Sequence, residues 1–224
     1  MRCTGPGIAA VLPAAWAFTA LLALPAGASM HASSVSLQRG AEIQELAPGK
    51  FLVARRGIPD PNFAEAVILL VRYDKKNAMG LIVNRATDIP VSRVLKELGI
   101  AKGRQDPVHL GGPVGRTGVL ALLRSKTKPE EARHVFADVY LVSSGKALDK
   151  AVTAGTAPAA LRVYLGYSGW AAGQLEHEVE RGMWHVLKAD SDTVFDSDPD
   201  SVWLRMIQRT ELRRALAPPA IGTD

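Results

Sequence analysis

The chain has 224 residues, of which 47% are hydrophobic, and this is enough for one domain with a packed core. Its single cysteine is Cys3, so a chain without its first residues has no thiol for a disulfide, a thiolate metal site or a cysteine nucleophile. The formal net charge of +5 is small for this length and the basic residues are dispersed, which indicates solubility rather than nucleic-acid binding.

The N-terminal segment has the pattern of an export signal. An apolar run over residues 8–24 precedes Pro25 and the small residues Ala26-Gly27-Ala28. The run is shorter than the roughly 20 residues that a membrane span needs, and it ends in a cleavage-like site. We therefore expect a periplasmic or secreted protein; a retained membrane anchor, or a cytoplasmic protein that starts at Met30, is the alternative. The expected division is a signal peptide at 1–28, a flexible leader at 29–45, one domain at 46–216 and a C-terminal tail at 217–224.

Strand formers dominate the first half of the domain. Residues 66–73 form a continuous apolar run that predicts a buried central strand. Residues 91–98 carry apolar side chains at i, i+3, i+4 and i+7, which predicts a helix between Pro90 and Gly99. The other expected segments are a strand at 51–54, a turn-rich loop at 55–63, a turn at 74–80, a strand at 80–84, and strands at 108–110 and 119–123 around Gly111-Gly112-Pro113.

The second half mixes strands with helices. We expect strands at 139–142, 161–165 and 183–187, and helices at 146–153, 171–181 and 201–216. Because strands and helices do not alternate regularly, the sequence favours an α+β fold over a doubly wound parallel sheet.

Four blocks of sequence occur in a recognisable order between Leu46 and Arg209. They are LAPGKFLVA followed by Asp60-Pro61-x-Phe63, NAMGLIVNR at 77–85, HLGGPV at 109–114 and LGYSGWAAGQLEHEV at 165–179. In this order and spacing they resemble the YqgE/AlgH family, bacterial proteins of unsettled function. The resemblance implies an α+β fold in which a mixed, bifurcated sheet curls into a pseudo-barrel with helices packed outside. It implies no secure activity, and it carries only a loose link to the regulation of gene expression.

The segment Gly166–Trp170 is expected to form a turn between a strand and a helix. It is similar to the nucleophile elbow G-x-S-x-G centred on Ser168, although Trp170 stands where the second glycine is required and His177 lies on the polar side of its helix. A glycine-bearing turn before a helix also offers free backbone N–H groups to an anion. A third interpretation is structural, with glycines at positive φ and Trp170 packed in the core.

Strand ends that converge predict a concave binding site. Asn84, Gly111 and Gly166 each end a predicted strand, and the planar fork of Arg85 suits a carboxylate or phosphate. We expect Arg85 to point toward the turn at 166–169, with Arg124 as a second possible cation; alternatively, Arg85 pairs with Asp60 and ties loops together. The expected ligand-binding residues are Asn84, Arg85, Gly111, Gly112, Gly166, Tyr167, Ser168 and Gly169.

Metal and nucleic-acid sites are not expected. The pair His177-Glu178 is followed by Arg181 where a zinc helix of the type H-E-x-x-H needs histidine. The terminal helix presents arginines opposite an apolar face, but no nucleic-acid-binding motif accompanies them. The arginines are Arg205, Arg209 and Arg213, and the expected packing face is Val202, Trp203, Met206, Ile207 and Thr210.

The sequence thus favours a non-enzymatic binding or accessory protein of the cell envelope. Its expected partner is a small anionic ligand or an envelope protein, with no cofactor, no nucleic acid and no stable membrane span after removal of the signal. A hydrolase centred on Ser168 and a transcriptional regulator are the alternatives.

Overall fold

The computed structural model of the protein describes residue 39 and residues 42–97 and 104–216. The expected signal peptide and C-terminal tail lie outside the described residues, as does most of the expected leader. Glu42, at the end of that leader, forms an ion pair with Arg55 at 2.9 Å between Oε2 and Nη2, so contacts with the domain begin before Leu46.

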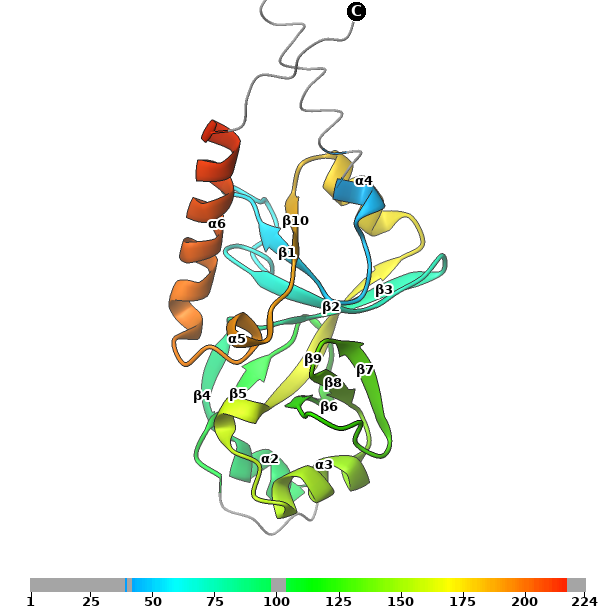
Figure 1. The fold of residues 1–224 in the computed structure, drawn as a ribbon, viewed down its shortest axis with the longest axis vertical. Coiled ribbons are helices and arrows are strands. Elements are labelled where there is room, and N and C mark those ends of the chain that lie inside the picture. The colour runs from blue at the N-terminus through cyan, green and yellow to red at the C-terminus, as the bar shows by residue number, and fades with distance from the viewer. Residues whose placement is uncertain (1–38, 40–41, 98–103, 217–224) are drawn as a thin grey trace, which may run out of the picture.

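Ten strands form a strongly curled, mainly antiparallel sheet, a half-barrel with helices packed outside it, so the fold is α+β as expected (Figure 1). The sheet runs in the order β10-β1-β2-β3-β9-β6-β8-β7, and β5 and β4 branch from β9. The strands are β1 (Lys50–Ala54), β2 (Val67–Tyr73), β3 (Asn77–Ile82), β4 (Ala86–Pro90), β5 (Pro107–Leu110), β6 (Val114–Arg124), β7 (Ala132–Phe136), β8 (Val139–Val142), β9 (Leu161–Ala171) and β10 (Trp184–Lys188).

The long strand β9 is the place where the sheet branches. Along one edge its first half pairs with β5 in parallel, with His109 opposite Tyr164, and its second half pairs with β3, with Gly80 opposite Ser168. The other edge pairs with β6. The change of partner falls at Gly166, which has a φ of +69° that only glycine adopts readily. The sheet is therefore bifurcated, as the family resemblance implies.

The helices cover the two ends of this sheet (Figure 1). The terminal helix packs along β1, and α2 and α3 lie at the opposite end, beyond the strands β4 to β8. The helices are α2 (Val91–Glu97), α3 (Gly145–Thr153), the short 3-10 helix η1 (Pro158–Ala160), α4 (Gln174–Glu180), α5 (Ser191–Val194) and α6 (Pro199–Leu216). Among the described residues, no helix has the length and apolar character that crossing a bilayer demands.

Apolar side chains form two core clusters, and alternate residues of β6, β8 and β9 belong to one cluster or the other. Trp170, expected to be a core anchor, is 3% exposed in the larger cluster. Its indole Nε1–H and that of Trp184 both donate to Glu178 Oε2, at 2.8 and 2.9 Å. The predicted packing face of the terminal helix is confirmed, with Met206 only partly buried.

The sequence-based prediction was wrong at the most conspicuous segment. Residues 166–170 are part of β9 rather than a turn, and α4 begins only at Gln174. Glycines normally weaken a strand, but here they permit the close backbone contacts of the branch point. The prediction also missed the short elements β4, β7 and α5. It placed strands at 108–110 and 119–123, whereas β5 and β6 are both longer than these ranges.

Candidate ligand-binding site

The predicted glycine segments do converge, but they pack against one another. A Cβ on Gly111 would lie 2.3 Å from the carbonyl oxygen of Gly166, and one on Gly112 would lie 2.3 Å from the carbonyl carbon of Tyr167. The Gly111 N–H donates to Leu165 at 2.9 Å, so the backbone around the branch point is paired. The glycines give close backbone approach here, and the expected strand-to-helix turn with free N–H groups does not exist.

Ser168 and its neighbours have packing roles in this arrangement. Ser168 is fully buried, and its Oγ donates to the carbonyl oxygen of Gly111 at 3.2 Å. The ring of Tyr167 lies against Gly115 and Gly169, where a Cβ on either glycine would meet it. Because the Ser168 hydroxyl is buried and already donates to a carbonyl, its surroundings do not support a role as a nucleophile.

Asn84 and Arg85 both bind the loop before β2. The Asn84 side chain accepts from the Val67 N–H at 2.8 Å and donates to the Glu65 carbonyl at 2.9 Å. Arg85 donates to the carbonyls of Asn62 and Ala64, at 2.7 and 3.2 Å. Burial lowers the pKa of Arg85, and the nearby Arg116 lowers it further. Arg85 therefore ties loops together, as the alternative anticipated, but through backbone carbonyls rather than Asp60.

The other charged candidates are paired or exposed. Arg124 forms ion pairs with Asp138 at 2.8 Å and Asp192 at 3.0 Å. His177 is exposed and lies 3.6 Å from Glu180. Within the described residues, no three His, Cys, Asp or Glu side chains gather in a way that would hold a metal ion.

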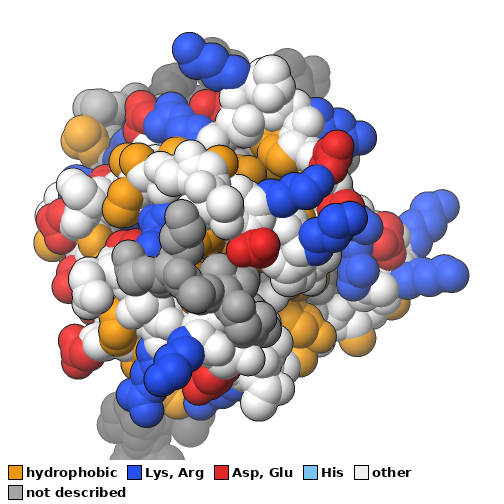
Figure 2. Space-filling view, turned by 90° about the horizontal axis from the view of Figure 1, so that it is seen from below, with side chains coloured by type: hydrophobic (Ala, Val, Ile, Leu, Met, Phe, Trp, Pro, Cys, Tyr) orange, Lys and Arg blue, Asp and Glu red, His pale blue; other side chains and the backbone are white. Residues whose placement is uncertain are grey.

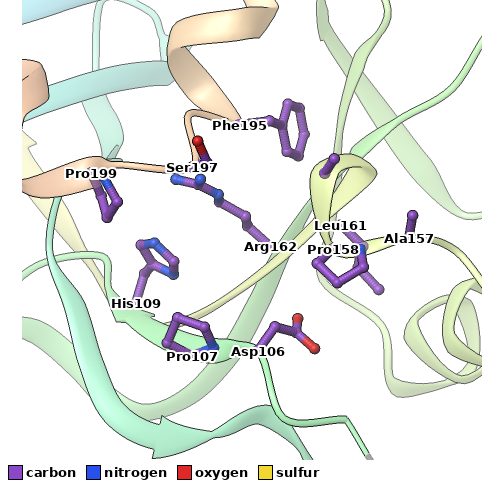
Figure 3. A pocket seen from close by; sticks show the side chains of 11 residues that line it. Asp106, Pro107, His109, Ala157, Pro158, Leu161, Arg162, Phe195, Ser197 and Pro199 are labelled. Carbon is purple, nitrogen blue, oxygen red and sulfur yellow. The ribbon is translucent and has the colours of Figure 1, made fainter.

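A cavity of about 440 Å³ lies beside the first half of β9, and none of the residues predicted for the glycine site lines it (Figure 3). Its volume is in the range of small-molecule sites. Residues of β5, η1, β9 and the segment leading into α6 line it, and most of the lining is apolar. The apolar side chains include Pro107, Ala157, Pro158, Leu161, Phe195 and Pro199.

Arg162 extends from β9 into the middle of this cavity, toward Phe195 and Ser197 (Figure 3). The residue is only 8% exposed. It donates to the carbonyl oxygen of Val83 at 3.3 Å and to that of Asp196, and it pairs with no carboxylate of the described residues. The carboxylate in the cavity, Asp106, is held by Arg104, with both nitrogen–oxygen distances at 2.9 Å. Arg162 is thus a buried cation without a counter-charge in this part of the chain.

His109 faces the cavity from β5, below Arg162 (Figure 3). It is 3% exposed, and within the described residues neither ring nitrogen forms a hydrogen bond of good geometry. Burial, followed by the charge of Arg162, lowers the pKa of His109, while the Pro107 carbonyl and Asp106 act in the opposite direction, and the net result is a pKa of about 4. Behind it, the ring of Tyr164 lies 5.5 Å away between centroids, and its buried hydroxyl also lacks a partner in that part of the chain. Burial raises the pKa of this hydroxyl.

Sequence reasoning missed both cavity residues. Residues 161–165 were identified only as a strand, yet Arg162 is a charged residue inside an apolar run, and a charge in such a position needs a partner. His109 gave a similar, weaker signal beside the glycine pair. The contribution of residues 195–199, far along the chain, had no local signal at all.

On the face seen in Figure 2, Lys and Arg side chains are interspersed with Asp and Glu. On α6, Arg205 is held by Asp196. The side chain of Arg213 lies outside the described residues.

Comparison with known proteins places the chain in a family. The AlgH-like family model (DUF179) matches residues 51–215. UPF0301 protein MCA0413 1 of Methylococcus capsulatus is 35% identical, with the match covering 73% of this chain and 91% of that protein, and a UPF0301 protein of Caulobacter vibrioides is 36% identical over 72% and 85%.

Two solved structures have a similar fold. The solution structure of AlgH from Pseudomonas aeruginosa has a TM-score of 0.61 at 30% identity and covers 77% of this chain and 95% of its own. The crystal structure of DIP2367 from Corynebacterium diphtheriae has a TM-score of 0.64 at 24% identity, with 74% and 87% covered. The bifurcated sheet, the four sequence blocks and these matches agree, and the chain belongs to the AlgH-like UPF0301 family.

Proposed function

We propose that this protein is a non-enzymatic binding protein of the cell envelope whose ligand occupies the cavity around His109 and Arg162. The observation that carries the proposal concerns two buried polar side chains that line a mostly apolar cavity. In the described part of the chain, neither ring nitrogen of His109 has a hydrogen-bond partner, and Arg162, which donates to two backbone carbonyls, has no counter-charge. Buried polar groups without partners are rare because each costs about 1–3 kcal/mol. A ligand that supplies those partners would remove the cost.

Binding, rather than catalysis, is favoured by the surroundings of Ser168. A hydrolase centred on this residue needs an accessible hydroxyl beside a base, and this hydroxyl is buried and donates to Gly111. That the residues around Gly166 contact a ligand remains a prediction. Their tight packing favours a structural role in the sheet.

Placement in the envelope rests on the sequence of residues 1–28. Cleavage after Ala28 would leave Ser29 as the mature N-terminus. N-terminal sequencing of protein recovered from the periplasm or the medium tests this. Recovery of soluble cytoplasmic protein that retains residues 1–28 would contradict export without affecting the cavity.

The binding proposal is tested by identifying what the cavity holds. Native mass spectrometry of the purified protein, followed by an NMR screen of small fragments, should report ligands that shift the amide signals of the non-proline residues in 106–109, 157–162 and 195–199. Ala159→Trp, at the cavity wall, should abolish these shifts, whereas Ala172→Trp, at an exposed position outside the cavity, should leave them unchanged. Fragments that bind the two variants with the same affinity as they bind the wild type would contradict the proposal.

A further inference from the structure

We propose that the ligand is a monocarboxylate with a compact apolar body, held by Arg162 and His109 together, and that its capture takes up one proton. This inference rests on the proposed function and specifies the chemistry of the same cavity. Three features support it: the missing counter-charge, the form of the imidazole and the lining of the cavity.

Arg162 supplies the charge that selects an anion. Two backbone carbonyls accept from it, but a carbonyl dipole does not neutralise a buried guanidinium, and buried charges in proteins are normally paired. Asp106 does not fill this role because Arg104 binds both of its carboxylate oxygens. A planar carboxylate fits the planar donor fork of arginine and would complete the pair.

His109 supplies the second donor once it is protonated. In the free protein its ring is neutral at pH 7 because burial disfavours the charge. The charged or titratable groups that face it are Asp106, just before its own strand β5, and Arg162 and Tyr164 from β9. An anion between Arg162 and His109 would weaken the repulsion from Arg162 and favour the imidazolium, whose extra N–H then donates to the carboxylate. The proton comes from solvent.

The cavity lining defines the rest of the ligand. Proline, alanine, leucine and phenylalanine side chains surround the two polar groups, which suits a hydrocarbon ring or branched chain rather than a sugar. A phosphate dianion would need more donors than one guanidinium and one imidazole provide. One carboxylate on an apolar body matches the single cation present.

The test compares cyclohexanecarboxylate with cyclohexanecarboxamide on the wild-type protein, by calorimetry and NMR. The two probes have the same body and differ in charge. We expect the carboxylate to bind at least roughly tenfold more tightly, since its ion pair with the Arg162 guanidinium is replaced in the amide by a hydrogen bond to an uncharged oxygen. We also expect its affinity to rise as the pH falls from about 8 to about 6.5, a range in which the carboxylate of the probe stays ionised. Calorimetry in buffers of different ionisation enthalpy should show proton uptake approaching one.

Variants separate the two side chains. Arg162→Gln should remove most of the preference for the carboxylate, and Arg162→Lys, which keeps the charge without the fork, should keep part of it. His109→Gln should retain binding but lose the pH dependence and the proton uptake. Lys96→Gln removes one positive charge at an exposed position on α2, as Arg162→Gln does in the cavity, and should behave as the wild type.

The outcomes distinguish this inference from the function beneath it. If carboxylate and amide bind in the cavity with equal affinity, or if carboxylate binding neither depends on pH nor takes up a proton, the inference is overturned while the cavity remains a binding site. If cyclohexanecarboxamide shifts the backbone N–H signals of the cavity and cyclohexanecarboxylate does not, the inference is also overturned while the cavity remains a binding site. If neither probe nor any fragment of the screen reaches the cavity, the proposed function itself fails.

Discussion

The buried polar residues of this protein fall into two groups. Ser168 and the indole of Trp203 donate to backbone carbonyls, at 3.2 and 2.7 Å, and they hold the fold together. His109 and Tyr164 have no such partners among the described residues, and Arg162 lacks a counter-charge there. A fold does not gain stability from groups of the second kind, so the presence of His109 and Arg162 in the lining of one cavity supports a ligand there.

His109 should make the stability of the free protein depend on pH. Its pKa of about 4 in the folded state lies below the ordinary value of 6.5, so between these values the unfolded chain binds a proton that the folded chain does not. The free energy of unfolding should therefore fall as the pH falls from about 6.5 to about 4, by up to about 3 kcal/mol. Urea unfolding of the wild type and of His109→Gln at several pH values measures this.

Other groups also titrate in this range, so the comparison between variants decides. His109→Gln should flatten the profile, whereas His177→Gln, at an exposed histidine, should leave it unchanged. Parallel profiles for the wild type and His109→Gln would show that His109 is not buried in its neutral form.

Trp170 tests the core at the scale of one residue. Its ring stacks on Phe63 with centroids 6.1 Å apart and meets Trp184 edge-on, and its N–H donates to Glu178. Trp170→Ala should lower the free energy of unfolding by on the order of 3–5 kcal/mol, as expected for a large buried aromatic side chain. A loss below about 1 kcal/mol in urea unfolding would contradict its burial.

At the scale of elements, β9 determines both the fold and the site. Its second half pairs with β3, and its first half lies between β6 and the parallel strand β5 and carries Arg162 and Tyr164. Periodicity predicted the apolar strands and the helices α2, α3 and α6 because these are buried on a regular face. It did not predict that β9 continues through Gly166–Trp170, because the reason is a partner strand far away in the sequence, and glycine locally indicates a turn.

The same reasoning explains why the cavity lies elsewhere than the site predicted from the sequence. The glycine segments were correctly expected to meet, but the sequence does not show whether converging backbones leave space or fill it. The cavity combines β5, β9 and residues 195–199, and only the folded chain brings these together.

Substitution of the glycines should show the tightness of the branch point. Gly111→Ala places a Cβ 2.3 Å from the Gly166 carbonyl oxygen, and backbone on both sides cannot easily move away. We expect a loss of about 2–3 kcal/mol in the free energy of unfolding, as for overpacked cores. Gly145→Ala, in α3 with nothing within 4 Å of the new Cβ, is the control and should be neutral or slightly stabilising. Equal effects of the two changes in chemical denaturation would contradict the packing role.

At the scale of the whole molecule, the cavity lies where the segment before α6 meets the branch of the sheet that carries α2 and α3. Arg162 connects these parts, since it donates both to Val83 and to Asp196, just before α6. A ligand that neutralises Arg162 would strengthen this connection. Saturation with cyclohexanecarboxylate at 100 times its Kd should therefore stabilise the protein by about 2.7 kcal/mol, which thermal unfolding would detect as a higher Tm. An unchanged Tm under these conditions would exclude binding to the folded state.

The most direct test of the central claim is the pKa of His109 itself. It is measured by NMR titration of the imidazole signals, with and without saturating probe. The account predicts a pKa near 4 in the free protein, as burial and Arg162 dictate, and a clear rise when cyclohexanecarboxylate is bound but not when cyclohexanecarboxamide is bound. An ordinary pKa near 6.5 in the free protein, or a pKa that the carboxylate leaves unchanged, would contradict it.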